Sequence, residues 1–247
     1  MNLNSEQHER TLRLLGKKKA RLLSEAHVLI VGLGGVGSYA AEHLCRAGIG
    51  KLTLVDPDKV QTSNINRQLI ALHSTVGQAK CDVMLQRLQM INPEAHLEAL
   101  QLFVNEENMS EVFKKQKYNY VIDAIDTLSP KTALIEKCLQ EQIPLVSSMG
   151  AGGRLHPELV QVDDISKTHH CHLARMVRKR LHRKNIYEGF RAVFSTEIIN
   201  PELIIKESGR NKNTNVGTIS YMPALFGLYC AATVINDLSE EKSSSGN

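Results

Sequence analysis

Short apolar runs alternate with segments of helical periodicity along the first 150 residues. Short segments rich in apolar residues predict strands, at residues 28–32, 51–56, 96–103, 118–126 and 143–150. Segments in which apolar residues recur every three or four positions predict helices, one ending at Arg46 and others over residues 75–92, 106–116 and 130–142. A charged segment with spaced leucines predicts a surface helix over residues 5–23.

This alternation predicts the fold class. Successive strands joined by helices form a parallel sheet with right-handed crossovers. Strands such as "VLIV" and "KLTLV" are apolar on both faces, so they belong in a sheet that helices cover on both sides. We therefore expect an α/β fold with a Rossmann-like, doubly wound, mainly parallel sheet. Ligands of such sheets bind at the carboxyl ends of the strands.

The pattern changes after Gly153. A basic helical stretch over 171–184 and a strand over 190–197 are followed by a segment over 208–217 whose composition predicts a mobile loop. We expect one domain in three parts: an N-terminal helix (1–26), a nucleotide-binding Rossmann-like part (27–153) and a C-terminal α+β elaboration (154–247).

An apolar stretch near the C-terminus raises the question of a membrane span. No charged residue occurs from Asn213 to Asn236, and residues 219–235 are largely apolar. This length is at the short edge of the roughly 17 to 25 residues that cross a bilayer, and Pro223 and Gly227 interrupt it. We expect a core or subunit-interface helix without stable membrane insertion, and peripheral membrane association stays open.

Composition and cysteine content indicate the cellular compartment. The chain has 247 residues, is 42% hydrophobic and carries a net charge of +4. Its five cysteines include no C-x-x-C pair, so they predict no structural zinc site, and their odd number and scatter are typical of reduced thiols. The polar first residues lack the apolar core of a signal peptide. We expect a cytoplasmic protein.

A glycine cluster follows the first strand. In "HVLIVGLGGVGSYAAEHL", Gly32, Gly34 and Gly37 fit G-x-G-x-x-G, and Gly35 adds another small residue. Such glycines let the backbone approach a phosphate at the N-terminus of a helix. Asp56 ends the second strand, where an acid accepts hydrogen bonds from ribose hydroxyls. These features are compatible with NAD, a flavin or ATP as the bound nucleotide.

The residues after Asp56 favour ATP. A site that splits a triphosphate needs fixed cations, and Arg67 and Lys80 both follow the ribose-binding strand. Polar residues flank Arg67, namely Asn64, Asn66 and Gln68. Asp126, at the end of the fourth strand, is placed to hold Mg²⁺ on the phosphates, although Asp126 and Thr127 also suit a helix N-cap.

The motifs that carry these residues resemble a known family. "GLGGVG", "LVDPDKVQTSNINRQ", "VGQAK", "INP" and "DAID" together are similar to the ThiF/MoeB/E1 superfamily of adenylating enzymes. Its members use ATP to adenylate a carboxylate and release pyrophosphate. The resemblance implies a Mg-ATP site that includes Gly35, Asp56, Asn64, Arg67, Lys80 and Asp126. The nucleotide-site residues that we expect are Gly32, Gly34, Gly35, Gly37, Asp56, Asp58, Asn64, Asn66, Arg67, Gln68, Lys80, Asp126 and Thr127.

The resemblance also implies a homodimer. Dimers of the family insert an N-terminal arginine into the partner's site, and here Arg10 and Arg13 are the candidates. A solvated helix face is the alternative for both. We expect catalysis to depend on Arg67, Lys80, Asp126 and one of these arginines.

Two branches of the superfamily differ in the carboxylate that they activate. One activates the C-terminal Gly-Gly of a sulfur-carrier protein and commonly has paired C-x-x-C zinc ligands, which this chain lacks. The other dehydrates N6-threonylcarbamoyladenosine beside the tRNA anticodon into a cyclic form. "SSMGAGGRL", "VQVDDISKT", "LARMVRKRL" and "VFSTE" are similar to this second branch. We therefore expect tRNA as substrate, and a sulfur-transfer partner stays an alternative.

The charge pattern agrees with a nucleic-acid partner. No acidic residue occurs between Ile165 and Tyr187. The basic residues of this interval are Lys167, Arg175, Arg178, Lys179, Arg180, Arg183 and Lys184. Clustered cations neutralise phosphates, so we expect this stretch to bind the anticodon arm. A solvated helix face is the alternative.

Overall fold

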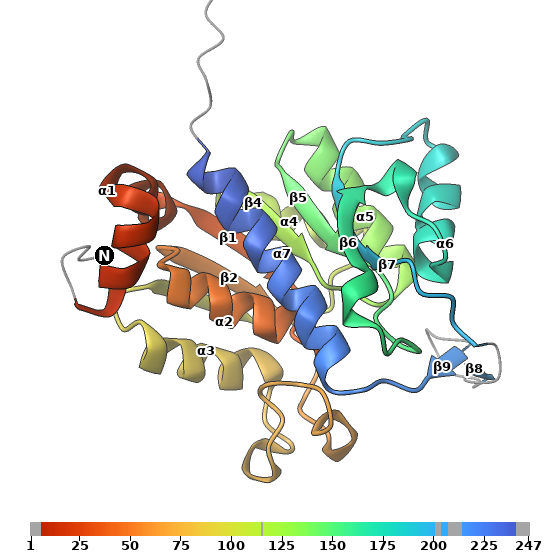
Figure 1. The fold of residues 1–247 in the computed structure, drawn as a ribbon, viewed down its shortest axis with the longest axis horizontal. Coiled ribbons are helices and arrows are strands. Elements are labelled where there is room, and N and C mark those ends of the chain that lie inside the picture. The colour runs from red at the N-terminus through yellow and green to blue at the C-terminus, as the bar shows by residue number, and fades with distance from the viewer. Residues whose placement is uncertain (1–5, 115, 201–203, 207–213, 241–247) are drawn as a thin grey trace, which may run out of the picture.

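A seven-stranded sheet forms the centre of the molecule (Figure 1). The computed structural model describes residues 6–114, 116–200, 204–206 and 214–240. The strands lie in the order β3-β2-β1-β4-β5-β7-β6. Their bounds are β1 His27–Val31, β2 Lys51–Val55, β3 His96–Leu100, β4 Tyr120–Asp123, β5 Leu145–Ser148, β6 Val160–Asp164 and β7 Arg191–Ser195.

Seven α-helices are described. They are α1 Glu9–Glu25, α2 Gly37–Ala47, α3 Lys80–Ile91, α4 Met109–Lys114, α5 Leu128–Gln140, α6 His172–His182 and α7 Tyr221–Ser239. Short 3-10 turns occur at Glu6–His8, Thr62–Asn64, His73–Thr75, Pro157–Leu159 and Ile165–Lys167. A separate antiparallel pair joins β8, Ile204–Lys206, to β9, Thr214–Val216.

The strand order is that of a doubly wound sheet. From β1 the chain builds outward to β2 and β3, and then crosses back to add β4 and β5 on the other side. Val31, at the end of β1, pairs in register with both Val55 and Asp123, so three strands end together at the point where the order reverses. Ligands of doubly wound sheets bind at this switch point. The expected fold class is confirmed.

Helices cover both faces of the sheet, which explains the unbroken apolar strands. Val28 and Ile30 of β1 face a core shared with α1, α2, α3 and α7. Leu29 and Val31 face the opposite core, shared with α4, α5 and α6. Because all four side chains are buried, β1 shows no apolar–polar alternation.

The apolar C-terminal segment forms a packed helix. Figure 1 shows α7 crossing in front of the sheet, where it packs mainly against α2. A Cβ atom at Gly227 would lie 2.4 Å from the carbonyl oxygen of Val36, so only glycine permits this close crossing. Phe226 and Cys230 are fully buried beside it. In the described chain, no helix is long and apolar enough to cross a membrane.

The observed elements differ from the sequence expectations at several places. Strand β6 was not expected, because this antiparallel edge strand is rich in polar residues. Helix α3 begins at Lys80 rather than residue 75, because a 3-10 turn and Gly77, with φ of +88°, precede it. Strand β4 ends at Asp123, so Asp126 lies beyond it. In the expected loop over 208–217, residues 214–216 form β9, and 208–213 lie outside the described residues.

Candidate nucleotide-binding site

The glycine turn joins β1 to α2 through very close backbone contacts. Gly32 has φ of +94°, and a Cβ atom there would lie 2.7 Å from the carbonyl oxygen of Ala124. A Cβ atom at Gly37 would lie 1.7 Å from the carbonyl oxygen of Gly32. Neither position accepts a side chain. The turn therefore packs against the segment after β4 and directs the N-terminus of α2 to the carboxyl edge of the sheet.

Gly34 and Gly35 lie beside the 67–68 segment. A Cβ atom at Gly35 would lie 3.1 Å from the carbonyl oxygen of Arg67, and one at Gly34 would lie 3.7 Å from Nε2 of Gln68. Gln68 is buried, and its Oε1 has no hydrogen-bond partner within the described chain. A buried amide oxygen beside a bare backbone turn fits a site that a ligand completes.

Asp56 connects the end of β2 to the glycine turn. Its Oδ2 accepts a hydrogen bond from the Leu33 N–H at 2.6 Å, and its Oδ1 accepts one from the Asp58 N–H at 2.8 Å. Burial raises the pKa of the Asp56 carboxyl, against the lowering effects of Lys80 and these two N–H donors. Each oxygen has a second lone pair, which a ribose hydroxyl can use.

Lys80 is the first residue of α3 and its side chain is buried. Its Nζ lies 2.9 Å from Oδ2 of Asp58 and 3.8 Å from Oδ1 of Asp56. The backbone N–H of Lys80 also donates to the carbonyl oxygen of Asp58 at 3.0 Å. The structure thus brings Asp56, Asp58 and Lys80 together at the carboxyl edge of the sheet.

The segment between β2 and α3 holds Arg67 in a compact turn. Arg67 Nη1 donates to the carbonyl oxygen of Ser63 at 2.9 Å and to Oδ1 of Asn66 at 2.8 Å. The buried Asn64 side chain accepts from the Gln61 N–H at 3.1 Å. These bonds place Arg67 beside the glycine turn, although its guanidinium is folded onto its own loop.

The two aspartates after β4 have different surroundings. Asp123 is fully buried, and its Oδ2 accepts hydrogen bonds from Lys131 Nζ at 2.7 Å and from Ser147 Oγ at 2.6 Å. Its Oδ1 accepts from the Ile125 N–H at 3.1 Å. Asp126 is exposed, in the turn before α5. Of the two carboxylates, only that of Asp126 is accessible to an ion from solvent.

Thr127 precedes α5 but does not act as expected for a side-chain cap. It occupies the N-cap position, yet its side chain makes no capping hydrogen bond. The described residues contain no group of three or more potential metal-ligating side chains. One exposed carboxylate is nevertheless compatible with Mg²⁺, because this ion is commonly held by one or two carboxylates together with substrate phosphates.

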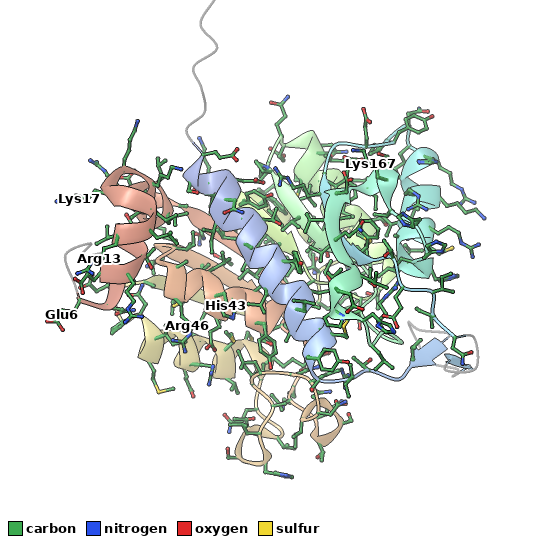
Figure 2. The ribbon with its side chains drawn as sticks, viewed as in Figure 1. Glu6, Arg13, Lys17, His43, Arg46 and Lys167 are labelled. Atoms are coloured by element: carbon green, nitrogen blue, oxygen red, sulfur yellow. The ribbon has the colours of Figure 1, made fainter. Side chains whose placement is uncertain are left out.

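The N-terminal arginines lie on another side of the molecule. Arg10 and Arg13 are exposed on α1, and Arg13 Nη2 lies 2.5 Å from Oε1 of Glu9. Figure 2 shows Arg13 at the left, whereas the 57–79 segment projects at the bottom in the same view. The structure of one chain therefore does not bring these arginines to the nucleotide-site residues.

The basic helix α6 has one buried and one exposed face. Ala174, Val177 and Leu181 pack into the core. Arg175, Lys179 and Arg183 are exposed and four residues apart, so they follow one side of the helix.

The other basic residues of this interval contact residues outside α6. Arg178 donates to Thr168 Oγ1, and Arg180 donates to Ser129 Oγ at 2.7 Å. Ion pairs join Lys184 Nζ to Glu136 at 2.5 Å and Lys167 Nζ to Asp163 at 3.3 Å. The interval itself contains no acidic residue, but Glu136 of α5 and Asp163 of β6 partly neutralise its positive charge.

All five cysteines are buried. Burial raises the pKa of the Cys45 thiol to about 11 and that of Cys230 to about 12. The nucleophilic form of a cysteine is the thiolate. These two side chains therefore do not offer an activated sulfur nucleophile.

Comparison with known proteins places the chain in a family. The model of the ThiF family matches residues 7–247, and the chain belongs to this family. The chain is 41% identical over 235 residues to the tRNA threonylcarbamoyladenosine dehydratase of Bacillus subtilis, with 92% of each chain covered.

A crystal structure of the Escherichia coli tRNA N6-threonylcarbamoyladenosine dehydratase in complex with ATP superposes with a TM-score of 0.88 and 37% identity. It covers 100% of this chain and 99% of that one. The adenylyltransferase and sulfurtransferase UBA4 of Saccharomyces cerevisiae is 31% identical over 149 residues, which span 60% of this chain and 33% of that protein. The similarity to the dehydratases therefore extends over the C-terminal elaboration, whereas the match to UBA4 covers a smaller share.

Sequence reasoning did not assign a role to the pair formed by Asp123 and Lys131. An aspartate inside the apolar run "YVIDAI" was the available signal, because a carboxylate in a buried strand requires a partner. The identity of that partner could not be known without the helix packing.

We predict that Lys131→Met strongly destabilises the protein, because it leaves the fully buried Asp123 carboxylate without its cation. Removing one partner of such a pair costs about 3–5 kcal/mol. Lys137→Met is the matched control on the same helix, where the partly exposed pair with Glu141 contributes about 0.5 kcal/mol or less. Urea unfolding measures both, and equal midpoints for the two variants would contradict the prediction.

Proposed function

We propose that this protein catalyses the ATP-dependent dehydration of N6-threonylcarbamoyladenosine in tRNA. The main support is the full-length similarity to the ATP-bound Escherichia coli dehydratase. The converging glycine turn, Asp56 and Lys80 add independent support, because they form an edge suited to a nucleotide. The exposed cations of α6 suit a tRNA substrate.

The first step activates the substrate carboxylate. A carboxylate oxygen of the threonine moiety attacks the α-phosphorus of ATP, and the bond from that phosphorus to pyrophosphate breaks. The product is an acyl-adenylate. Charge moves onto the departing pyrophosphate, and we assign its stabilisation to Arg67 and Lys80 because fixed cations are most effective in a partly buried site.

The second step closes the ring. The carbamoyl nitrogen or oxygen of the same side chain attacks the activated carboxyl carbon, AMP leaves, and the attacking group loses a proton. The net change is loss of one water from the nucleoside and cleavage of ATP to AMP and pyrophosphate. An intramolecular attack has a high effective molarity, so no enzyme nucleophile is needed, which agrees with the buried cysteines.

We assign Mg²⁺ binding to Asp126 together with the phosphates of ATP. The carboxylate of Asp126 fits this role because it is exposed, whereas that of Asp123 is fully buried. When bound, the ion supplies positive charge that neutralises the phosphate oxygens.

We also propose a homodimer in which Arg10 or Arg13 acts in the partner's site. Both are exposed on α1, and Figure 2 shows Arg13 on another side of the molecule from the 57–79 segment. A tRNA substrate further implies a cytoplasmic location.

Analysis of tRNA nucleosides tests the proposed function. In a strain that lacks the gene, mass spectrometry is expected to show loss of the cyclic nucleoside and accumulation of its uncyclised precursor. An unchanged nucleoside profile would contradict the proposal. Pyrophosphate exchange that requires a small protein ending in Gly-Gly, and that ignores tRNA, would select the sulfur-carrier alternative and its sulfur-transfer partner.

Asp126→Ala is expected to abolish ATP-dependent turnover and leave the fold intact, because it removes an exposed metal ligand rather than a core residue. Turnover and the unfolding midpoint are measured on the same preparation. Glu141→Ala, at the far end of the following helix, serves as the control with wild-type turnover. A wild-type rate for Asp126→Ala would refute this role.

Mixed dimers test the action of an arginine across the interface. Arg10→Ala or Arg13→Ala chains mixed with Lys80→Ala chains should regain partial activity, because one of the two composite sites is then intact. A mixture of Arg67→Ala and Lys80→Ala chains is the control, since both defects fall in the site of their own chain and no site is restored. Absence of recovery after confirmed subunit exchange would show that neither arginine acts across the interface.

The exposed stripe of α6 is expected to contact tRNA phosphates. Arg175→Ala with Lys179→Ala should weaken binding of all tRNA substrates alike and reduce the slope of log affinity against log salt by about one unit for each lost contact. ATP affinity should hardly change. The control is Arg21→Ala with Lys51→Ala, which removes two exposed cations near the amino ends of the strands. An unchanged salt slope would identify the stripe as a solvated face.

A further inference from the structure

Arg154 is a buried charge that the proposed chemistry does not use. It lies in the "GAGGR" segment after β5 and is only 2% exposed. Its guanidinium donates to the backbone carbonyl oxygens of Gly150 at 3.0 Å, Glu197 at 2.5 Å and His170 at 3.1 Å. Burying a cation is costly unless its donors are satisfied, and here Nε, Nη1 and Nη2 each have a carbonyl acceptor.

The three acceptors belong to three different segments. Gly150 follows β5, Glu197 follows β7, and His170 precedes the N-cap of α6. Strands β5 and β7 are parallel neighbours. Arg154 therefore joins two strand ends at the carboxyl edge of the sheet to the start of the basic helix.

The backbone at the start of α6 is strained. His170 has φ of +52°, in the left-handed region that residues other than glycine rarely adopt. Such a conformation persists where the surrounding structure fixes it, and it is common at functional sites. Here the carbonyl group of His170 itself accepts the Nη2 hydrogen bond from Arg154.

The Arg154 segment is also connected to the nucleotide site. The N–H of Gly153 donates to the carbonyl oxygen of Gly217 at 2.8 Å. The next residue, Thr218, accepts a hydrogen bond from Nδ2 of Asn66 at 3.0 Å. Asn66 neighbours Arg67, so a continuous set of contacts runs from the nucleotide loop through Arg154 to α6.

We propose that Arg154 is a positioning residue, which fixes α6 relative to the nucleotide site so that the modified adenosine of bound tRNA meets the α-phosphate of ATP. The inference rests on the proposed function. A lysine would keep the charge, but its ammonium group lacks the planar fork that reaches three carbonyl groups at once. Arg154→Lys should therefore misplace α6 while keeping its exposed cations.

Single-turnover dehydration by the full-length Arg154→Lys variant, at saturating ATP and tRNA, tests this role. The rate constant should fall about 10- to 100-fold, the effect of a small misplacement of reacting groups. The dissociation constants for ATP and tRNA, and the salt slope of tRNA binding, should stay at wild-type values. The control is Tyr120→Phe, which removes a hydrogen bond to Asp237 at the start of β4 and should retain the wild-type rate.

A wild-type rate for Arg154→Lys would overturn the positioning role but not the proposed function. A loss of rate that only matches a loss of folded protein would do the same. A wild-type protein without dehydration activity would instead overturn the proposed function, and the positioning role with it.

Two variants at His170 keep the inference testable where Arg154→Lys does not fold. Both remove the imidazole and keep the carbonyl group, but asparagine tolerates the left-handed conformation whereas glycine loosens it. His170→Gly should lower the rate constant at saturation by about threefold or more, and His170→Asn should retain it. Equal rates for the two variants would overturn the inference.

Discussion

The buried ion pair between Asp123 and Lys131 organises the carboxyl edge of the sheet. Through one carboxylate it joins the end of β4 to α5, to Ser147 of β5 and to the N–H of Ile125. The turn that it shapes packs against Gly32, so the position of the glycine turn depends on it. A buried pair adds little net stability over apolar residues of the same size. The pair therefore contributes mainly by fixing the geometry of this turn, and it adds little to the free energy of unfolding.

Local features of the sequence were sufficient for most of the fold. The apolar runs located β1, β2 and β5 because strands buried on both faces have no competing interpretation at that length. The glycine turn was predictable because close backbone contacts exclude any side chain at Gly32 and Gly37. The grouping of Asp56 with Lys80 was expected because Lys80 follows, along the chain, the strand that Asp56 ends.

The remaining features depend on contacts between distant residues. Strand β6 gave no apolar pattern, because only Val160 of its five residues is buried. The acidic partners of Lys167 and Lys184 come from other elements, so the charge of the basic interval was overstated by the sequence alone. The burial of Arg154 could not be predicted from the sequence, because its three partners are backbone carbonyl groups, which every residue carries.

The burial of every cysteine has a consequence for redox chemistry. Oxidants and alkylating reagents act on accessible thiolates, and burial raises the thiol pKa at Cys45, Cys81, Cys138 and Cys230. The folded protein should therefore resist peroxide and maleimides without any reductant. A cysteine introduced at an exposed position would then be the one reactive thiol, which makes the native chain a ready background for site-specific fluorescent or spin labels.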